Sequence, residues 1–464
     1  MRQRFIFLLL LIALIFGGYL RLLKLGAQSY WQDELISVLI GKADCQSIVV
    51  FCARGDVNPP LYYLLIGAWG KIWGFSEFST RFFSVILGIL GIAAIFWLGR
   101  ELLSERAGVS ASLLVALNYG HLYFSQEARH YTLVFLLTVL SYLFLVRFLK
   151  NNRLDDKLFY FLFTTALLYT HYFGIFILAA QMIFLFYFWV LGRNKIKSFF
   201  SLFWPALLVA GGYLFWFEGL QHVLNLGSYW TSKPDCFFFI DYFLDFIGRD
   251  FWLFFVFVFL VVLYFLRHPA PAAFPDQRGL FFFWMVCPLL FPYLRAFHHP
   301  SPLVSRYTIV ILPALILAVV GGLETIRSRR LAGLFLVLIL FLSVRVIFRP
   351  GIYLEKINHE KWREIAEFVM KIDPKNCYLV FGTYRTDFWK YYFERKNDYR
   401  KIYWVSHNQP EFFHNPRILK LDGFWLLEMK DYLTLEVQQF LEKKFSSYLR
   451  LDFNYGRVTL YKLN

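Results

Sequence analysis

Long apolar runs alternate with short polar connections along the first 350 residues of the chain. The hydrocarbon core of a bilayer is about 30 Å thick, so a helix needs about 20 apolar residues to cross it. Applied to this chain, the criterion predicts about eleven spans, near residues 5–20, 82–99, 108–124, 131–149, 158–170, 172–191, 198–217, 249–267, 279–295, 305–325 and 331–349. The expected fold class is an α-helical polytopic membrane protein.

The connections between the predicted spans differ in charge. Lys and Arg gather in alternate connections, which hold Arg2, Arg4, Arg100, Arg106, Arg147, Lys150, Arg153, Lys157, Arg193, Lys195, Lys197, Arg267, Arg278, Arg327, Arg329 and Arg330. Cytoplasmic connections are enriched in these residues, so this side, with the N-terminus, is predicted to be cytoplasmic. The alternation requires that Leu61–Gly74 does not cross. This short segment is rich in Tyr and Trp and carries Lys71, which favours an interfacial helix.

The opposite side is expected to collect most of the remaining polar residues. It holds the connections 26–81, 125–130, 170–172, 218–248 and 298–306, and everything after about residue 350. This distribution predicts that any chemistry lies on the non-cytoplasmic face.

After residue 350 the pattern changes to that of a water-exposed domain. Helical spacing of apolar residues predicts a helix at 358–372 and another at 433–445. Short apolar runs predict strands at 378–381, 402–405, 424–427, 448–453 and 457–462, the last two joined like a hairpin. The predicted organisation is a transmembrane domain at 1–350 and a small extracytoplasmic α/β domain at 351–464.

The composition agrees with a membrane protein and excludes other classes. Of the 464 residues, 58% are hydrophobic and 21% aromatic, far outside the range of soluble domains. The net charge of +16 comes from clusters between apolar runs, which indicates membrane topology, so no nucleic acid partner is expected. The five cysteines show no CxxC spacing, which excludes the usual zinc and redox motifs.

An acidic pair, Asp33-Glu34, follows the first apolar run. A carboxylate at the level of the lipid headgroups can act as a general base on a lipid-borne substrate. The structural alternative is that Asp33 caps an interfacial helix beginning at Glu34, whose charge favours the helix dipole. Later in the same connection, Asn58-Pro59-Pro60 stiffens the return to the membrane because each proline fixes its own φ.

A second polar group lies between two predicted spans, in the run from Tyr123 to Tyr131 that contains Glu127, Arg129 and His130. An unpaired Arg at a helix centre in the membrane costs about 3 kcal/mol, so such residues persist where they pair or bind a polar ligand. The alternative is a surface pair between Glu127 and Arg129, although residues two apart do not face each other on a helix.

Two further candidates are predicted on the same side of the membrane. His171 lies in a tight turn between two spans, and Arg306 lies at the mouth of the span 305–325. The guanidinium fork matches phosphate oxygens, which makes Arg306 a candidate phosphate ligand. The alternatives are a structural histidine among aromatic side chains and an arginine that snorkels to the interface.

These groups fit one reaction. If a sugar is carried on a lipid phosphate, the leaving group is a stable phosphate anion and no general acid is needed. One carboxylate deprotonates the acceptor, and cations stabilise the phosphate as its charge develops. Asp33 would supply the carboxylate, and Arg129 and Arg306, with His171 as a further candidate, the positive charge.

Seven short motifs carry a resemblance to a known family. They are Trp31-Gln32-Asp33-Glu34, Asn58-Pro59-Pro60-Leu61-Tyr62-Tyr63, Ser76-Glu77-Phe78-Ser79-Thr80-Arg81, Gly99-Arg100-Glu101-Leu102, Tyr123-Phe124-Ser125-Gln126-Glu127-Ala128-Arg129-His130-Tyr131, Tyr169-Thr170-His171-Tyr172 and Ser305-Arg306-Tyr307. In this order and spacing they resemble the bacterial GT-C fold glycosyltransferases that group with protein O-mannosyltransferases, aminoarabinose transferases and rhizobial lipopolysaccharide galacturonosyl transferases. The likeness covers about residues 1–330.

The resemblance implies a polyprenyl-phosphate sugar donor, an extracytoplasmic active site and an aspartate base in the first outer connection. By position, that base is Asp33, with Glu34 beside it. The expected substrate- and phosphate-binding residues are Asn58, Glu127, Arg129, His130, Tyr131, His171 and Arg306. The chain departs from the family at Asn58, where His is usual, and at His130, where Met is common. A neutral amide brings no charge to a phosphate, so phosphate binding shifts to the arginines.

The expected function is transfer of a sugar from a polyprenyl phosphate to an acceptor on the outer face of the cytoplasmic membrane. The acceptor is a protein, lipid A, lipopolysaccharide core or another envelope glycan, and membrane lipids surround the enzyme. No cofactor is expected; a divalent metal on the carboxylate pair stays open, and the resemblance implies that it is not required. The alternatives are a transporter or flippase of lipid-linked sugars, which would favour mid-membrane charges and internal repeats, and a membrane scaffold with a partner-binding outer domain.

Overall fold

The computed structural model divides into two compact units. One, the helical unit, comprises Met1–Leu25 and Ser37–Glu355; the other, the C-terminal unit, comprises Gly26–Ile36 and Lys356–Asn464. The residues described are 2–56, 58–191, 199–226, 234–235, 237–267, 274, 276–298, 303–350, 361–372, 378–381, 386–395, 402–404, 423–429, 435–453 and 456–463. The predicted boundary at residue 350 stays a prediction, and the grouping of Gly26–Ile36 with the C-terminal unit was not foreseen.

In the described part of the helical unit, every regular element is a helix. The α-helices are α1 (Arg2–Leu22), α2 (Gln32–Lys42, which begins in the C-terminal unit), α3 (Cys45–Arg54), α4 (Leu61–Trp73), α5 (Glu77–Leu102), α6 (Glu105–Leu117), α7 (Tyr119–Ser125), α8 (Tyr131–Asn151), α9 (Leu154–Leu168), α10 (Phe173–Val190), α11 (Phe199–Tyr213), α12 (Phe217–Leu224), α13 (Phe238–Phe246), α14 (Phe251–Leu266), α15 (Gln277–Arg295), α16 (Leu312–Thr325) and α17 (Arg329–Ile347). Two short 3₁₀ helices, η1 (Leu214–Trp216) and η2 (Ser305–Ile311), precede α12 and α16.

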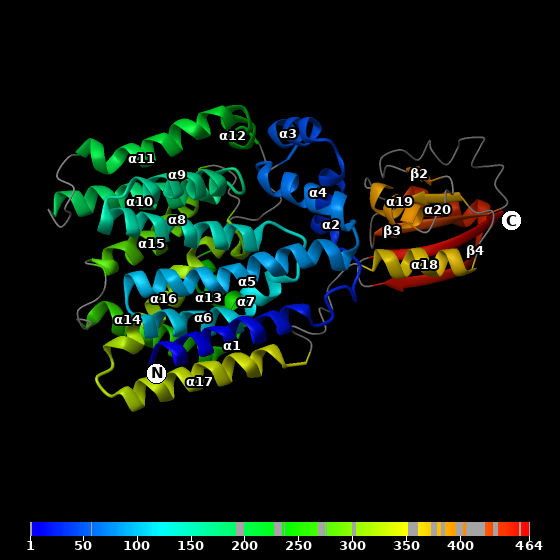
Figure 1. The fold of residues 1–464 in the computed structure, drawn as a ribbon. Helices are drawn as coiled ribbons and strands as arrows, with labels where there is room; N and C mark the ends of the chain where they lie inside the picture. Colours follow the sequence, from blue (N-terminus) through cyan, green and yellow to red (C-terminus); the bar gives the residue numbers. More distant parts are fainter. Residues whose placement is uncertain are drawn as a thin grey trace. The chain divides into compact units, whose positions relative to one another are not determined.

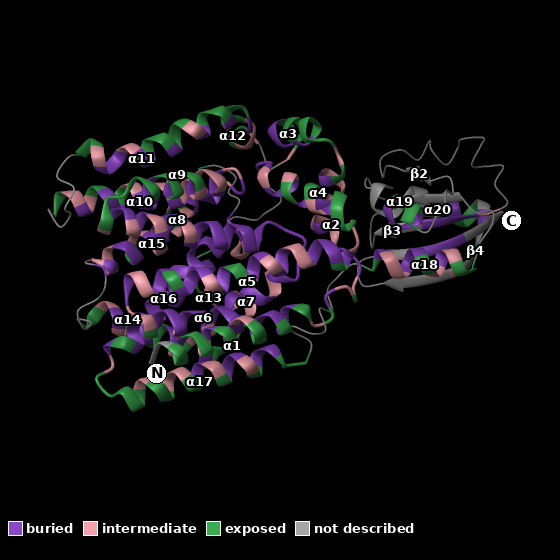
Figure 2. Cartoon of the chain, in the orientation of Figure 1, coloured by how far each residue is buried: buried purple, intermediate pink, exposed green. Residues whose placement is uncertain are grey.

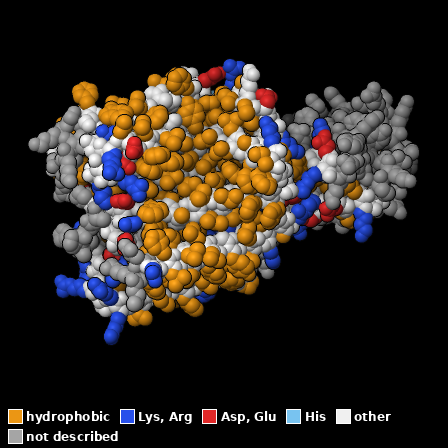
Figure 3. Space-filling view, viewed as in Figure 1, with side chains coloured by type: hydrophobic (Ala, Val, Ile, Leu, Met, Phe, Trp, Pro, Cys, Tyr) orange, Lys and Arg blue, Asp and Glu red, His pale blue; other side chains and the backbone are white. Residues whose placement is uncertain are grey.

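The core of the helical unit lies along α5, α6, α8 and α16, whose side chains are buried over most of their length (Figure 2). Helices α1, α11 and α17 carry many exposed apolar side chains, such as Ile15, Leu208 and Leu334. The face seen in Figure 3 is covered by hydrophobic side chains, with the charged ones gathered toward the ends of the helices. Exposed apolar side chains over such an area are those of a lipid-facing surface.

Seven helical segments in the described residues are long and apolar enough to cross a membrane, and an eighth is added if the bent pair α13 and α14 counts as one span. The predicted spans overlap described helical segments. Some are shorter or broken: 108–124 is divided into α6 and α7, and 158–170 corresponds to the short helix α9. The count of about eleven crossings stays a prediction.

One polar side chain explains a break in a predicted span, and the length of one helix agrees with a predicted non-crossing segment. Asn118 interrupts the run 108–124, because its Oδ1 accepts a hydrogen bond from the backbone N–H of His121 at 2.9 Å and starts α7 as a new helix. Helix α4 has 13 residues and is about 20 Å long, shorter than a bilayer core. A single helix of this length does not cross, in agreement with the prediction for Leu61–Gly74.

Helices α3 and α4 lie at one end of the helical unit, with α3 beside α12 (Figure 1). The exposed pair Arg54 and Glu218, 2.8 Å apart, joins α3 to α12. Exposed ion pairs of this kind contribute about 0.2–1 kcal/mol to stability. The pair therefore shows that α3 and α12 are neighbours but adds little to the stability of the fold.

The described strands of the C-terminal unit form one five-stranded sheet. The strands are β1 (Tyr378–Phe381), β2 (Ile402–Trp404), β3 (Gly423–Met429), β4 (Phe445–Phe453) and β5 (Gly456–Leu463), in the order β2-β1-β3-β5-β4. Strand β1 is parallel to β2 and β3, and β5 is antiparallel to β3 and β4. The predicted apolar runs fall on these strands, and the predicted turn at 454–455 lies outside the described residues.

The described helices of this unit are α18 (Trp362–Ile372), α19 (Thr386–Arg395) and α20 (Leu435–Lys444). The apolar face of α18, formed by Trp362, Ile365, Ala366 and Val369, is buried as its helical spacing predicts. The pattern did not predict α19, and the start of the predicted helix at 358–360 lies outside the described residues.

The segment Gly26–Ile36 is attached to the C-terminal unit by specific contacts. The backbone N–H of Tyr30 donates to the hydroxyl of Tyr392 at 2.8 Å, and the ring of Tyr30 meets that of Tyr391 edge to face. Arg363 donates to the backbone carbonyls of Gly26 and Ala27, at 3.3 and 2.5 Å. The segment that contains the acidic pair is therefore held by the chain's last hundred residues.

Candidate active site

The acidic pair lies in the first turn of α2. The helix begins at Gln32, two residues before the start that the structural alternative assumed, so Asp33 is inside it. Glu34 is fully buried, and its Oε2 accepts the backbone N–H of Trp31 at 3.2 Å. A glutamate that binds back to the N–H preceding its helix is half of a capping box. Glu34, and not Asp33, therefore satisfies this free backbone group.

One turn farther along α2, a serine connects the helix to a buried arginine. Asp33 and Ser37 are four residues apart, so they share one face of the helix. The hydroxyl of Ser37 accepts a hydrogen bond of 2.8 Å from Nη1 of Arg129. Ser37 was not among the predicted site residues; its position one helical turn after Asp33 was the signal that could have found it.

Arg129 lies in the turn between α7 and α8. Its backbone N–H donates to the carbonyl of Glu127 at 2.8 Å, and Gln126 anchors the turn by donating to the carbonyls of Arg21 and Leu23. Glu127 is 2% exposed and Arg129 4% exposed. The alternative of an exposed Glu127–Arg129 surface pair is therefore wrong, because neither side chain lies at the surface.

Four of the predicted residues come together from three connections of the helical unit. The rings of His130 and His171 are 4.8 Å apart, and His171 lies 4.7 Å from the ring of Tyr307. The guanidinium of Arg306 lies 5.6 Å from the ring of Tyr307. Tyr131, also predicted, has its ring 4.6 Å from that of His130 and 5.9 Å from the guanidinium of Arg129. Arg129, His130, His171 and Arg306 with these two tyrosines are called the arginine–histidine cluster below.

The electrostatics of the cluster show that both histidines are neutral near pH 7. Burial, and after it the charges of Arg129 and Arg306, lower the pKa of His171 to about 3. Burial also holds the pKa of His130 well below its usual range, helped by Arg129, His171 and Arg306. A charge that changes a pKa this way is near the group. The arginines, and not His171, therefore carry the positive charge of the cluster.

The two histidines differ in their hydrogen bonds. Nδ1 of His171 accepts the backbone N–H of Phe173 at 3.1 Å at the start of α10, so His171 has a structural role as well. Within the part of the chain that the structure describes, the buried Nε2 of His130 has no hydrogen-bond partner. A buried polar atom without a partner costs about 1–3 kcal/mol, and a ligand that binds it recovers this cost.

The Asn58-Pro59-Pro60 element leads into α4, whose first turn lies beside the cluster. The N–H of Leu61 donates to the carbonyl of Tyr169 at 3.0 Å, and the ring of Tyr62 lies 6.1 Å from that of His130. The side-chain amide of buried Asn58 donates a hydrogen bond to the carboxylate Oδ1 of Asp56 at 3.5 Å. Burial and Asp56 raise the pKa of Tyr63, and Arg129 lowers it. Asp56, which the sequence did not single out, therefore lies in the same electrostatic surroundings.

The start of α8 adds to the positive potential of the cluster. His130 precedes α8 and makes no side-chain cap to it. The first N–H groups of a helix carry partial positive charge and bind anions. Together with the guanidinium groups of Arg129 and Arg306, these N–H groups form a positively charged site that favours an anion such as a phosphate.

Among the described residues, no group of three or more His, Cys, Asp or Glu side chains is placed to hold a metal ion. The expectation that no cofactor is required stays a prediction.

The sequence and the fold were compared with those of known proteins. Residues 57–216 match the family model described as dolichyl-phosphate-mannose-protein mannosyltransferase. No curated protein sequence matches the chain. The matched region includes the Asn58-Pro59-Pro60 element, the turn with Arg129 and His130, and His171.

Solved structures share the fold over almost the whole chain. ArnT from Cupriavidus metallidurans in the apo state has a TM-score of 0.63 at 14% identity, with 99% of this chain and 98% of that chain covered. The same protein bound to undecaprenyl phosphate gives 0.62 at 12% identity, with the same coverage. AglB, an oligosaccharyltransferase from Archaeoglobus fulgidus, in complex with an inhibitory peptide and a dolichol-phosphate, gives 0.55 at 11% identity, with 100% of this chain and 74% of that chain covered. The chain therefore has the fold of the GT-C glycosyltransferases, and its resemblance to their protein mannosyltransferase and aminoarabinose transferase members is confirmed.

Proposed function

We propose that the protein is a membrane glycosyltransferase that moves a sugar from a polyprenyl phosphate to an acceptor on the outer face of the cytoplasmic membrane. The observation that carries the proposal is the arginine–histidine cluster, in which the guanidinium groups of Arg129 and Arg306 lie near two neutral imidazoles and supply positive charge for an anionic ligand. Proteins of the same fold have been solved with undecaprenyl phosphate and with a dolichol-phosphate, which supports a donor of this class.

In this proposal the phosphate of the donor binds Arg129 and Arg306. Nη1 of Arg129 donates a hydrogen bond to the hydroxyl of Ser37, which holds the guanidinium in place, and the fork of N–H donors on this group suits a phosphate. His130 offers its buried Nε2 as a further hydrogen-bonding group, and Glu127, Tyr131 and Asn58 line the sugar side. His171 stabilises the start of α10 and keeps the Tyr307 ring in place.

Asp33 is the proposed general base. It takes the proton of the acceptor hydroxyl while the acceptor oxygen attacks the anomeric carbon of the sugar. The bond from that carbon to the phosphate oxygen breaks, and its electron pair leaves on the phosphate, where the arginines stabilise the charge. One base without a dedicated nucleophile favours direct displacement with inversion. Glu34 assists by fixing the start of α2 around Asp33.

The proposed orientation follows from the basic connections. The arginine–histidine cluster lies at non-cytoplasmic ends of the spans, and the C-terminal unit lies outside the membrane on that side. A flippase for lipid-linked sugars remains the second candidate. It is disfavoured because the charged candidates gather at one end of their helices and not in broken helices at mid-membrane.

The test measures donor binding and sugar transfer separately. The purified protein is incubated with a radiolabelled polyprenyl-phosphate sugar and cell-envelope extract. Asp33→Asn is expected to keep donor binding and to lose transfer by at least about a hundredfold, as expected for loss of a general base. Arg129→Gln is expected to weaken donor binding about tenfold or more, because a charge-assisted hydrogen bond contributes about 1.5–3 kcal/mol.

Asp44→Asn is the matched control for the carboxylate. Asp44 is exposed, lies in the same connection and caps α3, and Asn caps a helix as well as Asp does. This variant is expected to transfer at the wild-type rate. Full transfer by Asp33→Asn would refute the assignment of the base, and movement of intact lipid without labelling of any acceptor would favour the flippase.

A further inference from the structure

A polar cavity lies at the other end of the span from Arg306. It has a volume of about 940 Å³, and it is lined by Arg106, Arg267, Arg327 and Arg329, with Glu324 as its acidic residue. The helical run Ser305–Thr325 has 21 residues and is about 30 Å long, about the thickness of a bilayer core. This cavity is therefore separate from the arginine–histidine cluster.

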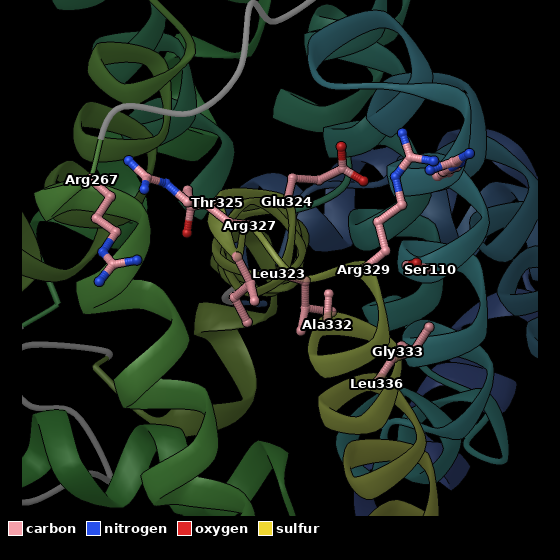
Figure 4. Close-up of a pocket in the computed structure, with 12 residues that line it drawn as sticks. Ser110, Arg267, Leu323, Glu324, Thr325, Arg327, Arg329, Ala332, Gly333 and Leu336 are labelled. Carbon is pink, nitrogen blue, oxygen red and sulfur yellow. The ribbon is translucent and has the colours of Figure 1, made fainter.

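The arginines of the cavity come from different parts of the chain. Figure 4 shows Arg267 following α14, Glu324 and Arg327 around the end of α16, and Arg329 at the start of α17. Arg106 belongs to the first turn of α6. Within the part of the chain that the structure describes, these four guanidinium groups make no hydrogen bond or ion pair. Four guanidinium groups and one carboxylate leave a net charge that an anion can balance.

The start of α17 increases this positive potential. Its first turn holds Arg329 and Arg330 and no acidic residue, and Ser328 caps it by accepting from the N–H of Leu331 at 3.3 Å. Basic residues at the positive end of a helix dipole are unfavourable unless an anion is present. Phosphate is a suitable anion for this cavity, because one guanidinium group can donate hydrogen bonds to two phosphate oxygens at once.

The position of the cavity indicates a lipid and not a soluble anion. Three apolar helices that end or begin here, α14, α16 and α17, place it where a membrane meets water. Beside the arginines, Leu323, Ala332 and Leu336 provide an apolar part of the lining. Leu334 and Val337 on α17 are mostly exposed, as lipid-facing residues are. The cavity therefore offers charge for a headgroup and apolar surface for acyl chains.

We propose that this cavity binds the phosphate headgroup of an anionic phospholipid, held by Arg106, Arg267, Arg327 and Arg329, with its acyl chains along Leu323 and Leu336. The inference does not rest on the proposed glycosyltransferase activity. A lipid at this place joins the ends of α6, α14, α16 and α17, and it also neutralises their charges.

Binding is measured on the full-length protein in a neutral detergent, with short-chain phosphatidylglycerol as the probe and phosphatidylcholine of the same chain length as the comparison. Native mass spectrometry counts the lipid retained at increasing concentration. Phosphatidylglycerol is expected to bind at least about tenfold more tightly than phosphatidylcholine. Arg329→Gln is expected to weaken it about fivefold, the effect of one basic residue at an anionic lipid surface.

Arg330→Gln is the matched control. It removes the same charge from the next residue of the same connection, so its effect on membrane topology equals that of Arg329→Gln, but Arg330 does not line the cavity. It is expected to leave phosphatidylglycerol binding unchanged, and Arg329→Lys to retain part of it. Equal losses in the two Gln variants, or equal binding of the two lipids, would overturn the proposal. Displacement of the lipid by millimolar inorganic phosphate would show that the cavity binds a soluble anion, and it would overturn the proposal of a phospholipid site.

Discussion

At the scale of single residues, the arginines and the histidines of the arginine–histidine cluster have different roles, which the sequence did not distinguish. From the sequence, Arg129, Arg306 and His171 were predicted together as cations for a phosphate. The lowered pKa of His171 and His130 makes the arginines the carriers of charge and the histidines neutral hydrogen-bonding groups. A neutral imidazole beside a guanidinium accepts protons poorly, which leaves the carboxylates of α2 as better candidates for the base.

The buried histidines predict a loss of stability in mild acid. The folded state keeps His171 neutral down to a pKa of about 3, whereas an unfolded histidine takes up a proton below about pH 6.5. The unfolded state thus binds more protons in this window, and stability falls as the pH falls from 6.5 toward 3. At pH 5 the loss from His171 is about 2 kcal/mol. The measurement is the thermal unfolding midpoint of wild type and His171→Gln between about pH 7.5 and about pH 5, which lie above and below the usual histidine pKa of about 6.5.

His171→Gln is expected to lower the midpoint at pH 7.5, because the contacts with Phe173 and Tyr307 are lost, but to show a flatter decline toward pH 5. A decline of equal steepness in wild type and His171→Gln would contradict the buried neutral state of this histidine.

The residue types of the cluster were visible in the sequence, but their proximity was not. Arg129, His171 and Arg306 were selected because ionisable groups beside apolar runs are costly without a role. Their meeting depends on contacts among α8, α10 and η2, which no local pattern encodes. Asp56 was missed because a single aspartate in a connection carries no distinctive local signal. Ser37 was missed because its signal, the position one helical turn after Asp33, depends on knowing that α2 extends this far.

At the scale of elements, the packing of α2 against α4 determines where Ser37 lies. The two helices approach closely at Gly41 and Gly67, where a Cβ on Gly67 would lie 2.5 Å from the carbonyl oxygen of Gly41. Contacts of this closeness require glycine, because the backbone carbonyl cannot give way locally. The position of α2, and with it the Arg129–Ser37 hydrogen bond, therefore depends on Gly67.

Gly67→Ala is expected to push α2 away from α4 and to weaken donor binding about tenfold, the effect of losing one hydrogen bond to a charged group. Donor binding and transfer are measured as for the Arg129 variant. The control is Gly211→Ala in α11, where an added Cβ meets nothing within 4 Å. That change should leave binding unaltered and stabilise the helix slightly, by up to about 1 kcal/mol. Wild-type binding by Gly67→Ala would mean that α2 is not fixed by this contact.

The elements themselves were largely predictable from periodicity. Apolar runs of about 20 residues and amphipathic spacing are local signals, and they located α5, α8 and α18. The breaks were harder to predict. The interruption at Asn118 depends on one side-chain cap within an apolar run, and the start of α2 at Gln32 depends on the capping bond of Glu34.

At the scale of the whole molecule, the C-terminal unit has a connection to the proposed chemistry that the sequence did not indicate. Residues 26–36 are separated from α18 and α19 by more than 300 positions, yet they belong to the same compact unit. Tyr30 is fully buried, and its N–H donates to the hydroxyl of Tyr392. Asp33 follows three residues later, so the C-terminal unit holds the segment that presents the proposed base.

Tyr392→Phe is the smallest change that tests this connection. It keeps the ring and removes the hydroxyl that accepts the Tyr30 N–H, which leaves a buried donor unsatisfied at a cost of about 1–3 kcal/mol. Faster hydrogen exchange is expected across residues 26–36, measured by mass spectrometry, together with slower sugar transfer and unchanged donor binding at Arg129. Tyr391→Phe, which keeps its ring against Tyr30, serves as the control and should exchange more slowly than Tyr392→Phe in this segment. If exchange in residues 26–36 is the same in Tyr392→Phe and wild type, the C-terminal unit does not hold this segment through Tyr392, and the loss of transfer would need another cause.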